Sequence, residues 1–224
     1  MKKYEFTGET KQVNFLFRTV TLHRIRAVVD FDLVKIGDLG GWIEKEENLS
    51  HDGKAWLYGG AEVWGEAKVW GNAEVYGDAE VCGNAEVYGN AEVWGDARVS
   101  GYAEVFGNAK VWGDTEVWGN AKVYGNAEVY GNAEVCGYAE VFSISHVLVI
   151  GAIGSRNSFT TFFRDKDGEI TVKCGCFLGK IDRFLEKVAS THGNSKYALV
   201  YRAAVEVAKL QIDITDETMQ VDEE

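Results

Sequence analysis

The stretch that decides the fold is GNAEVYGDAEVCGNAEVYGNAEVW at residues 71–94, in which Gly, Ala and Val return every six positions. The same rule holds without an insertion through 15 hexads at residues 53–142. Two earlier hexads, from residue 41, keep the phase by placing Ile43 and Leu49 at the alanine position. Seventeen hexads therefore share one period across residues 41–142.

A six-residue period is too short for a helical pair or a propeller blade, and it matches a parallel β-helix whose coils have three sides of one hexad each. Third-place Ala and fifth-place Val point inward, while the fourth and sixth places point outward, as on any strand. Gly at the first place and Asn or Asp at the second predict corners, since these residues best tolerate positive φ. The pattern resembles left-handed hexapeptide repeats, so we expect a mainly β protein built on a left-handed parallel β-helix of about six coils.

Sixth-place residues of successive coils stand 18 positions apart and form three outward ladders. Two ladders are wholly aromatic, and small residues interrupt the third. The first ladder holds Tyr58, Tyr76, Trp94, Trp112 and Tyr130, the second holds Trp70, Tyr88, Phe106, Tyr124 and Phe142, and the third holds Trp64, Cys82, Ser100, Trp118 and Cys136.

Two interpretations of the aromatic ladders stay open. Stacked rings reinforce a solenoid by roughly 0.5–1.5 kcal/mol per contact. The ten rings also form a larger apolar stripe than a soluble monomer usually exposes, which favours burial against another subunit, a partner or the flanking segments. On this second interpretation the oligomer or partner interface contains Tyr76, Trp94, Trp112, Tyr130, Trp70, Tyr88, Phe106 and Tyr124.

The formal net charge of −12 at pH 7 argues against nonspecific binding to nucleic acid or to anionic lipid. The charge is uneven, because residues 53–142 hold 14 acids and 5 bases whereas residues 146–210 hold 10 bases and 6 acids. We expect an anionic ligand on the second of these segments. Lys68, Arg98, Lys110 and Lys122 interrupt the carboxylates of the repeats, which weakens an interpretation as a DNA mimic.

The sequence contains no run of about 18 apolar residues and no apolar leader, so we expect a cytoplasmic protein that contacts no membrane. Cys82, Cys136, Cys174 and Cys176 lack metal-ligand spacing, and we expect reduced thiols without a zinc site. No nucleophile with a base, carboxylate pair or metal cluster stands at a catalytic spacing. We therefore expect no catalytic residue, no cofactor, no metal and no enzymatic activity.

The segments that flank the repeats have other patterns. Residues 1–40 hold apolar and β-branched runs, which predict three or four short strands that cap the first coil. Within them His23, Arg24 and Arg26 offer an anion contact, although alternation along a half-buried strand explains them equally well.

After residue 142 the hexad rule fails, and residues 143–212 predict a small α+β domain of three strands and two helices. The strands are expected at 146–151, 158–164 and 169–177, and the helices from Ile181 to near Gly193 and from Ser195 to about Leu210. Cys174 and Cys176 would then face the same side of a strand as packing residues. Residues 213–224 are expected to be an acidic disordered tail.

The loop GAIGSRN at residues 151–157 has the residue types of an anion pocket. Glycine allows close approach of backbone amides to a phosphate, and an arginine offers a planar fork. A polar turn between two strands remains the alternative, because the spacing is not that of a phosphate-binding loop followed by a helix. The candidate ligand-binding residues are Gly154, Ser155, Arg156, Asn157, Arg164 and His192.

Many left-handed hexapeptide proteins are acyltransferases that use a histidine base and a loop extruded from the solenoid, and many are trimers. This chain departs from that plan, because its phase is unbroken and His51 is the one histidine of its repeats, at an inward-facing place. We expect His51 to be a core or cap residue, and we keep acyl transfer as an alternative. The resemblance implies a homotrimer.

The whole chain also resembles hexapeptide-repeat proteins encoded by phages and prophages of Gram-positive bacteria. The matching stretches are LHRIRA and GDLGGWIEKEENLS before the repeats, and IGSRN, TTFF, CGCF and THGNSK after them. That family implies no established activity. We expect a non-enzymatic protein of the bacterial host cell whose C-terminal domain sequesters a small anionic ligand, such as a nucleotide-derived signal, in counter-defence. The alternative is an interaction module whose acidic, aromatic solenoid docks a host or virion protein.

Overall fold

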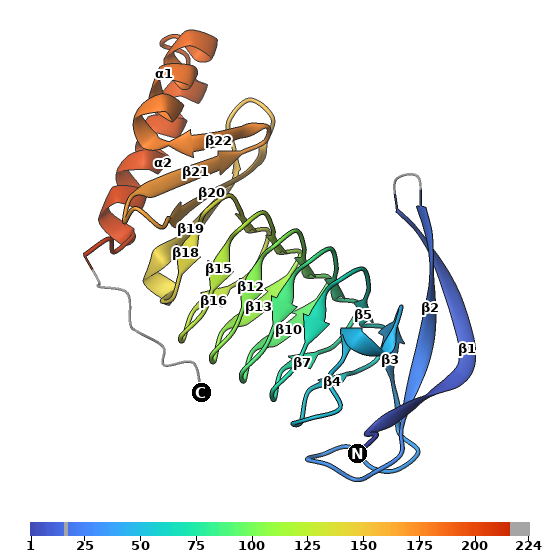
Figure 1. The fold of residues 1–224 in the computed structure, drawn as a ribbon. Helices are drawn as coiled ribbons and strands as arrows, with labels where there is room; N and C mark the ends of the chain where they lie inside the picture. Colours follow the sequence, from blue (N-terminus) through green and yellow to red (C-terminus); the bar gives the residue numbers. More distant parts are fainter. Residues whose placement is uncertain (16–17, 216–224) are drawn as a thin grey trace.

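The structure is a computed structural model that describes residues 1–15 and 18–215, with the side chain of Phe15 left undescribed. It confirms the predicted fold class: a parallel β-solenoid of about six turns lies between an N-terminal hairpin and a C-terminal antiparallel sheet with two helices (Figure 1). The predicted acidic tail lies largely outside the described residues.

Three parallel sheets form the sides of the solenoid, and each strand pairs with the one 18 residues further along, as Val75 does with Val93. The hairpin side contains β3 (Leu39–Ile43), β5 (Glu62–Val63), β8 (Glu80–Val81), β11 (Arg98–Val99), β14 (Glu116–Val117) and β17 (Glu134–Val135). The tryptophan side contains β4 (Trp56–Leu57), β7 (Glu74–Val75), β10 (Glu92–Gly95), β13 (Lys110–Gly113) and β16 (Glu128–Val129). The groove side contains β6 (Lys68–Val69), β9 (Glu86–Val87), β12 (Glu104–Val105), β15 (Lys122–Val123) and β18 (Glu140–Val141).

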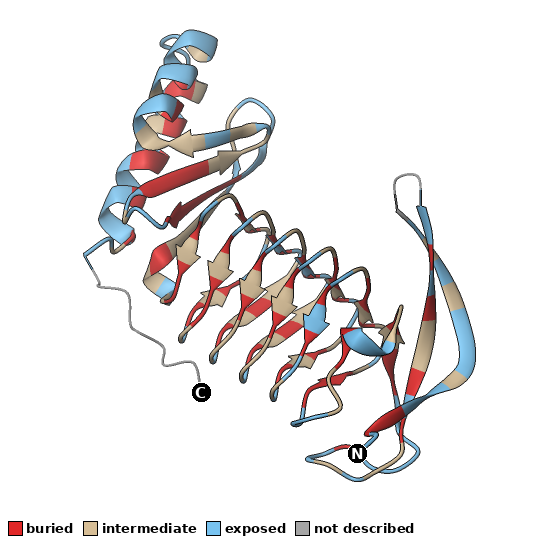
Figure 2. Ribbon diagram, viewed as in Figure 1, coloured by how far each residue is buried: buried red, intermediate tan, exposed pale blue. Residues whose placement is uncertain are grey.

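The core of the solenoid consists of the third-place alanines and fifth-place valines, which are fully buried as their alternation predicts (Figure 2). Ile43 and Leu49 occupy alanine positions and are buried in the same cluster. Thr115 is the polar exception, and its hydroxyl donates a hydrogen bond to the Trp112 carbonyl at 2.7 Å. A buried hydroxyl is tolerated there because it has this acceptor.

The corners differ from the expectation in one respect. The first-place glycines have φ between 63° and 79°, but the Asn and Asp residues at the second place do not adopt positive φ. These side chains instead bond along the corner: the Asn72 amide donates to Asn90, and the Asn90 amide donates to Asn108, at 3.1 and 3.2 Å. Contact with the same residue one coil above therefore accounts for the regular asparagines on this corner.

The N-terminal segment forms two long strands rather than several short ones, β1 (Tyr4–Phe15) and β2 (Arg18–Ala27), which join the hairpin side through β3. Val20 and Leu22 of β2 pack on Trp64 and Cys82, the outward residues of that side. The hairpin therefore covers the first two residues of the interrupted ladder.

The start of the solenoid is closed by polar contacts. The Tyr4 hydroxyl donates to the carbonyl of Glu46, the first residue of the short helix η1 (Glu46–Asn48), and to that of Leu49, its C-cap. The buried Lys3 ammonium donates to the Ala55 carbonyl at 2.7 Å. Burial lowers the pKa of Lys3 to about 8, with Asp52 acting in the opposite sense.

The C-terminal sheet contains four strands where the sequence predicts three. After the short helix η2 (Ile144–His146) come β19 (Val147–Ile153), β20 (Ser158–Arg164), β21 (Ile170–Cys174) and β22 (Phe177–Lys180). The predicted third strand breaks at Gly175, whose φ of 57° suits a two-residue hairpin turn that pairs Cys174 with Phe177. The expectation that Cys174 and Cys176 face one side of a strand is therefore wrong, since Cys176 lies in the turn.

The two helices, α1 (Ile181–His192) and α2 (Lys196–Gln211), confirm the predicted ones, with Gly193 as the C-cap of the first. They pack against the sheet in a second core that contains Phe162, Phe184 and Tyr201. The sheet is attached to the last coil, where the Glu134 amide donates to the Thr161 hydroxyl at 3.0 Å. None of the helices within residues 1–15 and 18–215 is long and apolar enough to cross a membrane.

Candidate functional site

The three sides of the solenoid differ in what covers them. The N-terminal hairpin buries Trp64 and Cys82 on the hairpin side, and at the other end of that side Cys136 is buried near Lys173 of β21. Burial raises the pKa of the Cys136 thiol to about 12, so it is a packing group and not a reactive thiolate. The two cysteines of this ladder thus lie where flanking segments cover the solenoid, whereas Ser100 between them is only partly buried.

The rings of the groove side form a continuous stack. Their centroids are 4.3 Å apart for Trp70 and Tyr88, 4.8 Å for Tyr88 and Phe106, and 4.9 Å for Phe106 and Tyr124, with planes within 5° of parallel. Each ring therefore covers the faces of its neighbours and presents its edge to solvent. This agrees with the reinforcing role predicted for the ladders.

The flanking segments cover little of the two aromatic ladders. Tyr124 and Phe142 are buried near the C-terminal domain, whereas Trp70 and Tyr130 are exposed. The remaining rings of both ladders are half-buried; these are Tyr58, Tyr76, Trp94, Trp112, Tyr88 and Phe106. Their predicted burial against another subunit or a partner stays a prediction.

A shallow hollow of about 1200 Å³ runs along the groove side. Its floor is the stack of Trp70, Tyr88, Phe106 and Tyr124. The corner residues Asn84, Tyr102 and Asn120 line it on one side and Asn72 and Asn90 on the other, and the fourth-place residues Glu86, Glu104, Lys122 and Glu140 complete it. We name this hollow the groove.

The groove is acidic. Its one lysine, Lys122, pairs with Glu104 at 3.2 Å, and Glu104 also accepts a hydrogen bond from the Tyr88 hydroxyl at 3.1 Å. Burial raises the pKa of Tyr124, and the Glu140 carboxylate adds to that effect. Within the described residues the Glu86 carboxylate has neither an ion pair nor a hydrogen bond, so it is available to a cationic partner.

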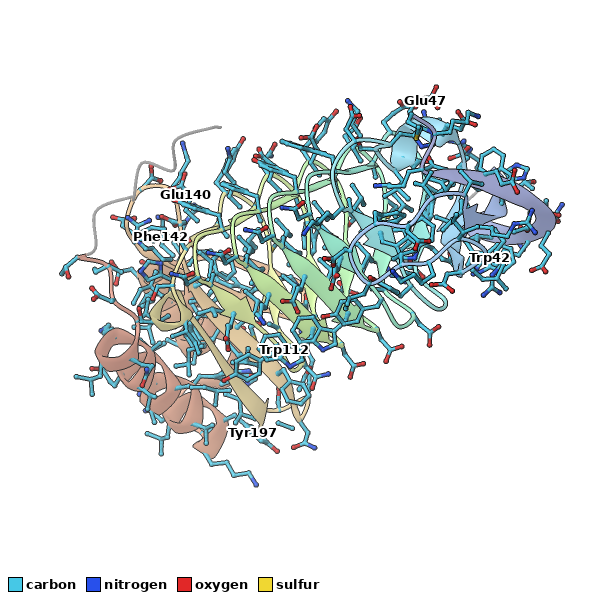
Figure 3. The ribbon with its side chains drawn as sticks, turned by 90° about the horizontal axis from the view of Figure 1, so that it is seen from below. Trp42, Glu47, Trp112, Glu140, Phe142 and Tyr197 are labelled. Atoms are coloured by element: carbon cyan, nitrogen blue, oxygen red, sulfur yellow. The ribbon has the colours of Figure 1, made fainter. Side chains whose placement is uncertain are left out.

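The stack is closed at its C-terminal end. His146 meets the Phe142 ring edge-on at 4.2 Å, and the Arg164 guanidinium lies 5.0 Å from the centre of that ring. Arg164 Nη1 is also 3.8 Å from a carboxylate oxygen of Glu140. Figure 3 labels Glu140 and Phe142 at this end of the solenoid, beside the C-terminal domain.

A second hollow, of about 780 Å³, adjoins the groove at the other end of the stack and shares Trp70 and Gly71 with it. His51 lies in its lining, where its ring stacks on Tyr4 with centroids 4.2 Å apart. The His51 Nδ1 accepts the Lys3 backbone N–H at 3.1 Å, so the neutral ring carries its hydrogen on Nε2. Burial lowers the pKa of His51, which favours this neutral form. His51 is thus in contact with the cap.

The loop predicted to bind an anion is a hairpin turn between β19 and β20, as the polar-turn alternative has it. A Cβ atom on Gly154 would lie 1.9 Å from the Tyr201 hydroxyl oxygen, so this glycine is needed for close packing on α2. Arg156 lies against Gly175, and His192 is 5.8 Å from Tyr201 between ring centroids. Ser155, Arg156 and Asn157 are exposed, and neither hollow described above contains a residue of the loop.

The structure therefore brings Gly154, Arg156 and His192 around Tyr201, but it does not bring Arg164 to them. Arg164 is buried over Phe142 at the junction with the solenoid. Burial raises the pKa of Tyr201 to about 12, with Cys174 adding to the effect and Arg156 opposing it. Within the described residues no group of three or more His, Cys, Asp or Glu side chains is arranged to hold a metal ion.

Sequence reasoning did not single out the groove as a hollow, nor Glu86 and Asp52 as available carboxylates. One signal was present: the groove-side ladder has Asp52 at the position one coil before Trp70, where the period would place a further ring. A break in a periodic stack predicts an uncovered ring face at that position.

No known family model matches the chain. It is similar to a protein of Escherichia coli strain K12 described as the uncharacterized acetyltransferase YdcK, with 34% identity over 62 residues. Those residues are 26% of this chain, and the match spans 19% of the length of the E. coli protein. The repeats and the solenoid agree with this similarity. The chain is a hexapeptide-repeat β-helix protein. The phage origin, the Gram-positive host and the homotrimer stay predictions.

Proposed function

We propose that this β-helix protein is a docking module whose groove binds an extended, basic segment of a partner protein. One observation carries the proposal: a hollow of about 1200 Å³ follows four stacked rings along the groove side and is left open by the rest of the described chain. Large apolar surfaces bordered by polar groups are typical of interaction sites.

The shape of the groove favours an extended segment. From Trp70 to Tyr124 its floor spans three steps between neighbouring coils, each of about 4.8 Å. The total of about 14 Å equals the length of about four residues of extended chain. The ring edges offer apolar contact, and the amides of Asn84 and Asn120 lie in the lining to hydrogen-bond a partner backbone.

The charge of the groove favours a basic partner. Glu86, Glu104 and Glu140 face it together with a single lysine, which is already paired. Two copies of the same acidic groove would repel each other, so self-association through this face is disfavoured. Arginine or lysine side chains of a different protein would pair with the free Glu86 carboxylate.

A charge reversal tests this function. In Glu86→Lys, a partner captured by the parent protein is expected to bind about tenfold more weakly, because a favourable charge contact becomes repulsive. The matched control is Glu128→Lys, at the same hexad place on the tryptophan side. The partner is first identified by quantitative capture with the parent and the two variants, and its basic segment is then titrated by calorimetry. Equal affinity for the parent and Glu86→Lys would exclude the groove as the docking site.

Acyl transfer is a second candidate, which the similarity to YdcK favours. His51 would have to change tautomer to act as a base at Nε2, because its Nδ1 is occupied by the Lys3 amide. Native mass spectrometry with acetyl-coenzyme A tests this candidate. On the docking proposal we expect no saturable adduct, whereas one acetyl-coenzyme A per chain, lost in His51→Ala, would establish the acyltransferase alternative.

Two predictions from the sequence remain as proposals that the same spectra test. Sequestration of a small anionic ligand by the C-terminal domain, in phage counter-defence, is supported by the placement of Arg156 and His192 around Tyr201. A nucleotide-sized adduct retained by the parent and lost in Arg156→Ala would establish it. The homotrimer rests on the hexapeptide resemblance, and a monomeric mass at micromolar concentration would exclude it.

A further inference from the structure

The stack on the groove side is closed at one end and open at the other. At the C-terminal end the Arg164 guanidinium lies over the last ring, Phe142, and close to the Glu140 carboxylate. At the N-terminal end the first ring is Trp70, and the residue one coil before it is Asp52. Trp70 has 39% of its surface exposed, although Tyr88 covers one of its faces. Within the described residues no ring stacks on its other side, where Trp70 borders a hollow together with Asp52.

The 780 Å³ hollow lies at this open end, and Trp70 and Gly71 belong both to it and to the groove. A segment that lies in the groove can therefore place a side chain in this hollow without leaving the groove side. Figure 3 labels Glu47 at this end of the solenoid and Glu140 at the other.

The hollow has an excess of negative charge. Glu46, Glu47 and Asp52 line it together with one lysine, Lys68, and the neutral His51. Glu46 is engaged by Lys2 at 2.6 Å, but within the described residues the carboxylates of Glu47 and Asp52 have no ion pair. A ligand that carries phosphate would be repelled here, and a planar cation would be attracted to both the carboxylates and the ring face.

We propose that this hollow binds the guanidinium of an arginine side chain from the docked segment, stacked on Trp70 and paired with Asp52 or Glu47. The inference rests on the proposed docking function, and it names arginine as the side chain that anchors the docked segment. Guanidinium is planar, stacks on aromatic faces and pairs with carboxylates through two parallel hydrogen bonds, whereas the ammonium of lysine does not stack. Arg164, Phe142 and Glu140 show a related arrangement at the other end of the same stack.

The test uses the full chain and small probes. The indole N–H resonance of Trp70 is assigned in an NMR spectrum through Trp70→Phe, and the parent is titrated with N-acetylarginine amide and N-acetyllysine amide. We expect a saturable shift of that resonance, with the arginine probe bound about three- to fivefold more tightly than the lysine probe. Asp52→Asn is expected to weaken arginine binding about threefold to tenfold, and the control Asp96→Asn, an exposed corner residue outside both hollows, to leave it unchanged.

The remaining outcomes would overturn either the arginine site or the docking function itself. Equal shifts with the two probes would overturn the stacking role of Trp70, and no shift with either would exclude the hollow as an arginine site. A nucleoside that shifts the resonance more strongly than arginine would also overturn the proposal. If the partner loses affinity in Glu86→Lys but keeps it in Asp52→Asn and Trp70→Ala, the docking function stands and the arginine anchor fails. Equal partner affinity for all variants removes the docking function itself.

Discussion

Gly95→Ala is expected to lower the free energy of unfolding by about 2–4 kcal/mol. The residue has φ of 76°, a conformation that costs a residue with a Cβ atom about 1–2 kcal/mol. The added methyl would also lie 3.0 Å from the backbone nitrogen of Gly113 in the next coil, and a backbone held by sheet hydrogen bonds on both sides moves little. The lower entropy of alanine in the unfolded chain offsets less than about 1 kcal/mol of this loss.

The matched control is Gly131→Ala. Gly131 is the first-place glycine two coils further along the same corner, and it is the last one there. Its φ is 75°, but a Cβ there would meet no atom within 4 Å. We expect a loss of only about 1–2 kcal/mol, the backbone contribution alone. Urea denaturation of the parent and the two variants measures both values. Equal losses in the two variants would mean that the coils move apart to admit the methyl, and that close stacking of the corners contributes little to stability.

Asp165→Asn is expected to cost about 3 kcal/mol of stability. This carboxylate is buried at the turn between β20 and β21, where it accepts hydrogen bonds from Lys180, from the Thr171 hydroxyl at 2.5 Å and from the Asp167 amide at 3.0 Å. Burial alone would raise its pKa, but these hydrogen bonds, together with one from the Glu169 amide, hold the pKa of Asp165 below its usual value. An asparagine keeps the size but loses the charge that Lys180 binds.

The pH dependence of the free energy of unfolding gives a second measurement of what the Asp165 carboxylate contributes. Because the folded pKa of Asp165 is lower than the unfolded value of about 3.9, its contribution is complete above that value and is lost as the pH falls below it. The free energy of unfolding should therefore fall more steeply below about pH 4 in the parent than in Asp165→Asn. Asp167→Asn, whose side chain is exposed, serves as the control, with an expected change below about 0.5 kcal/mol. Parallel acid profiles for the parent and Asp165→Asn would contradict this account.

The parts of the fold that follow from local pattern could be predicted from the sequence. The helices of the C-terminal domain were located within a residue or two, because amphipathic spacing and Gly193 mark their limits. The sequence predicts three strands where the sheet has four, because the two-residue turn of Gly175 and Cys176 leaves no polar stretch to separate β21 from β22. The positions of Arg156, His192 and Arg164 relative to one another could not be predicted, because they depend on how the sheet packs on α2 and on the last coil.

The sequence by itself determined the solenoid, its period, its inward alanines and valines and its three outward ladders, because each coil repeats the same short-range pattern and meets almost the same neighbours. Only the tertiary structure decided which ladder is covered. The hairpin bends back over Trp64 and Cys82, Arg164 closes the groove-side stack at Phe142, and Trp70 lines a hollow at the other end of that stack. These features join residues that are far apart in the chain, and the packing of the two flanking segments on the solenoid, which no local period encodes, sets their positions.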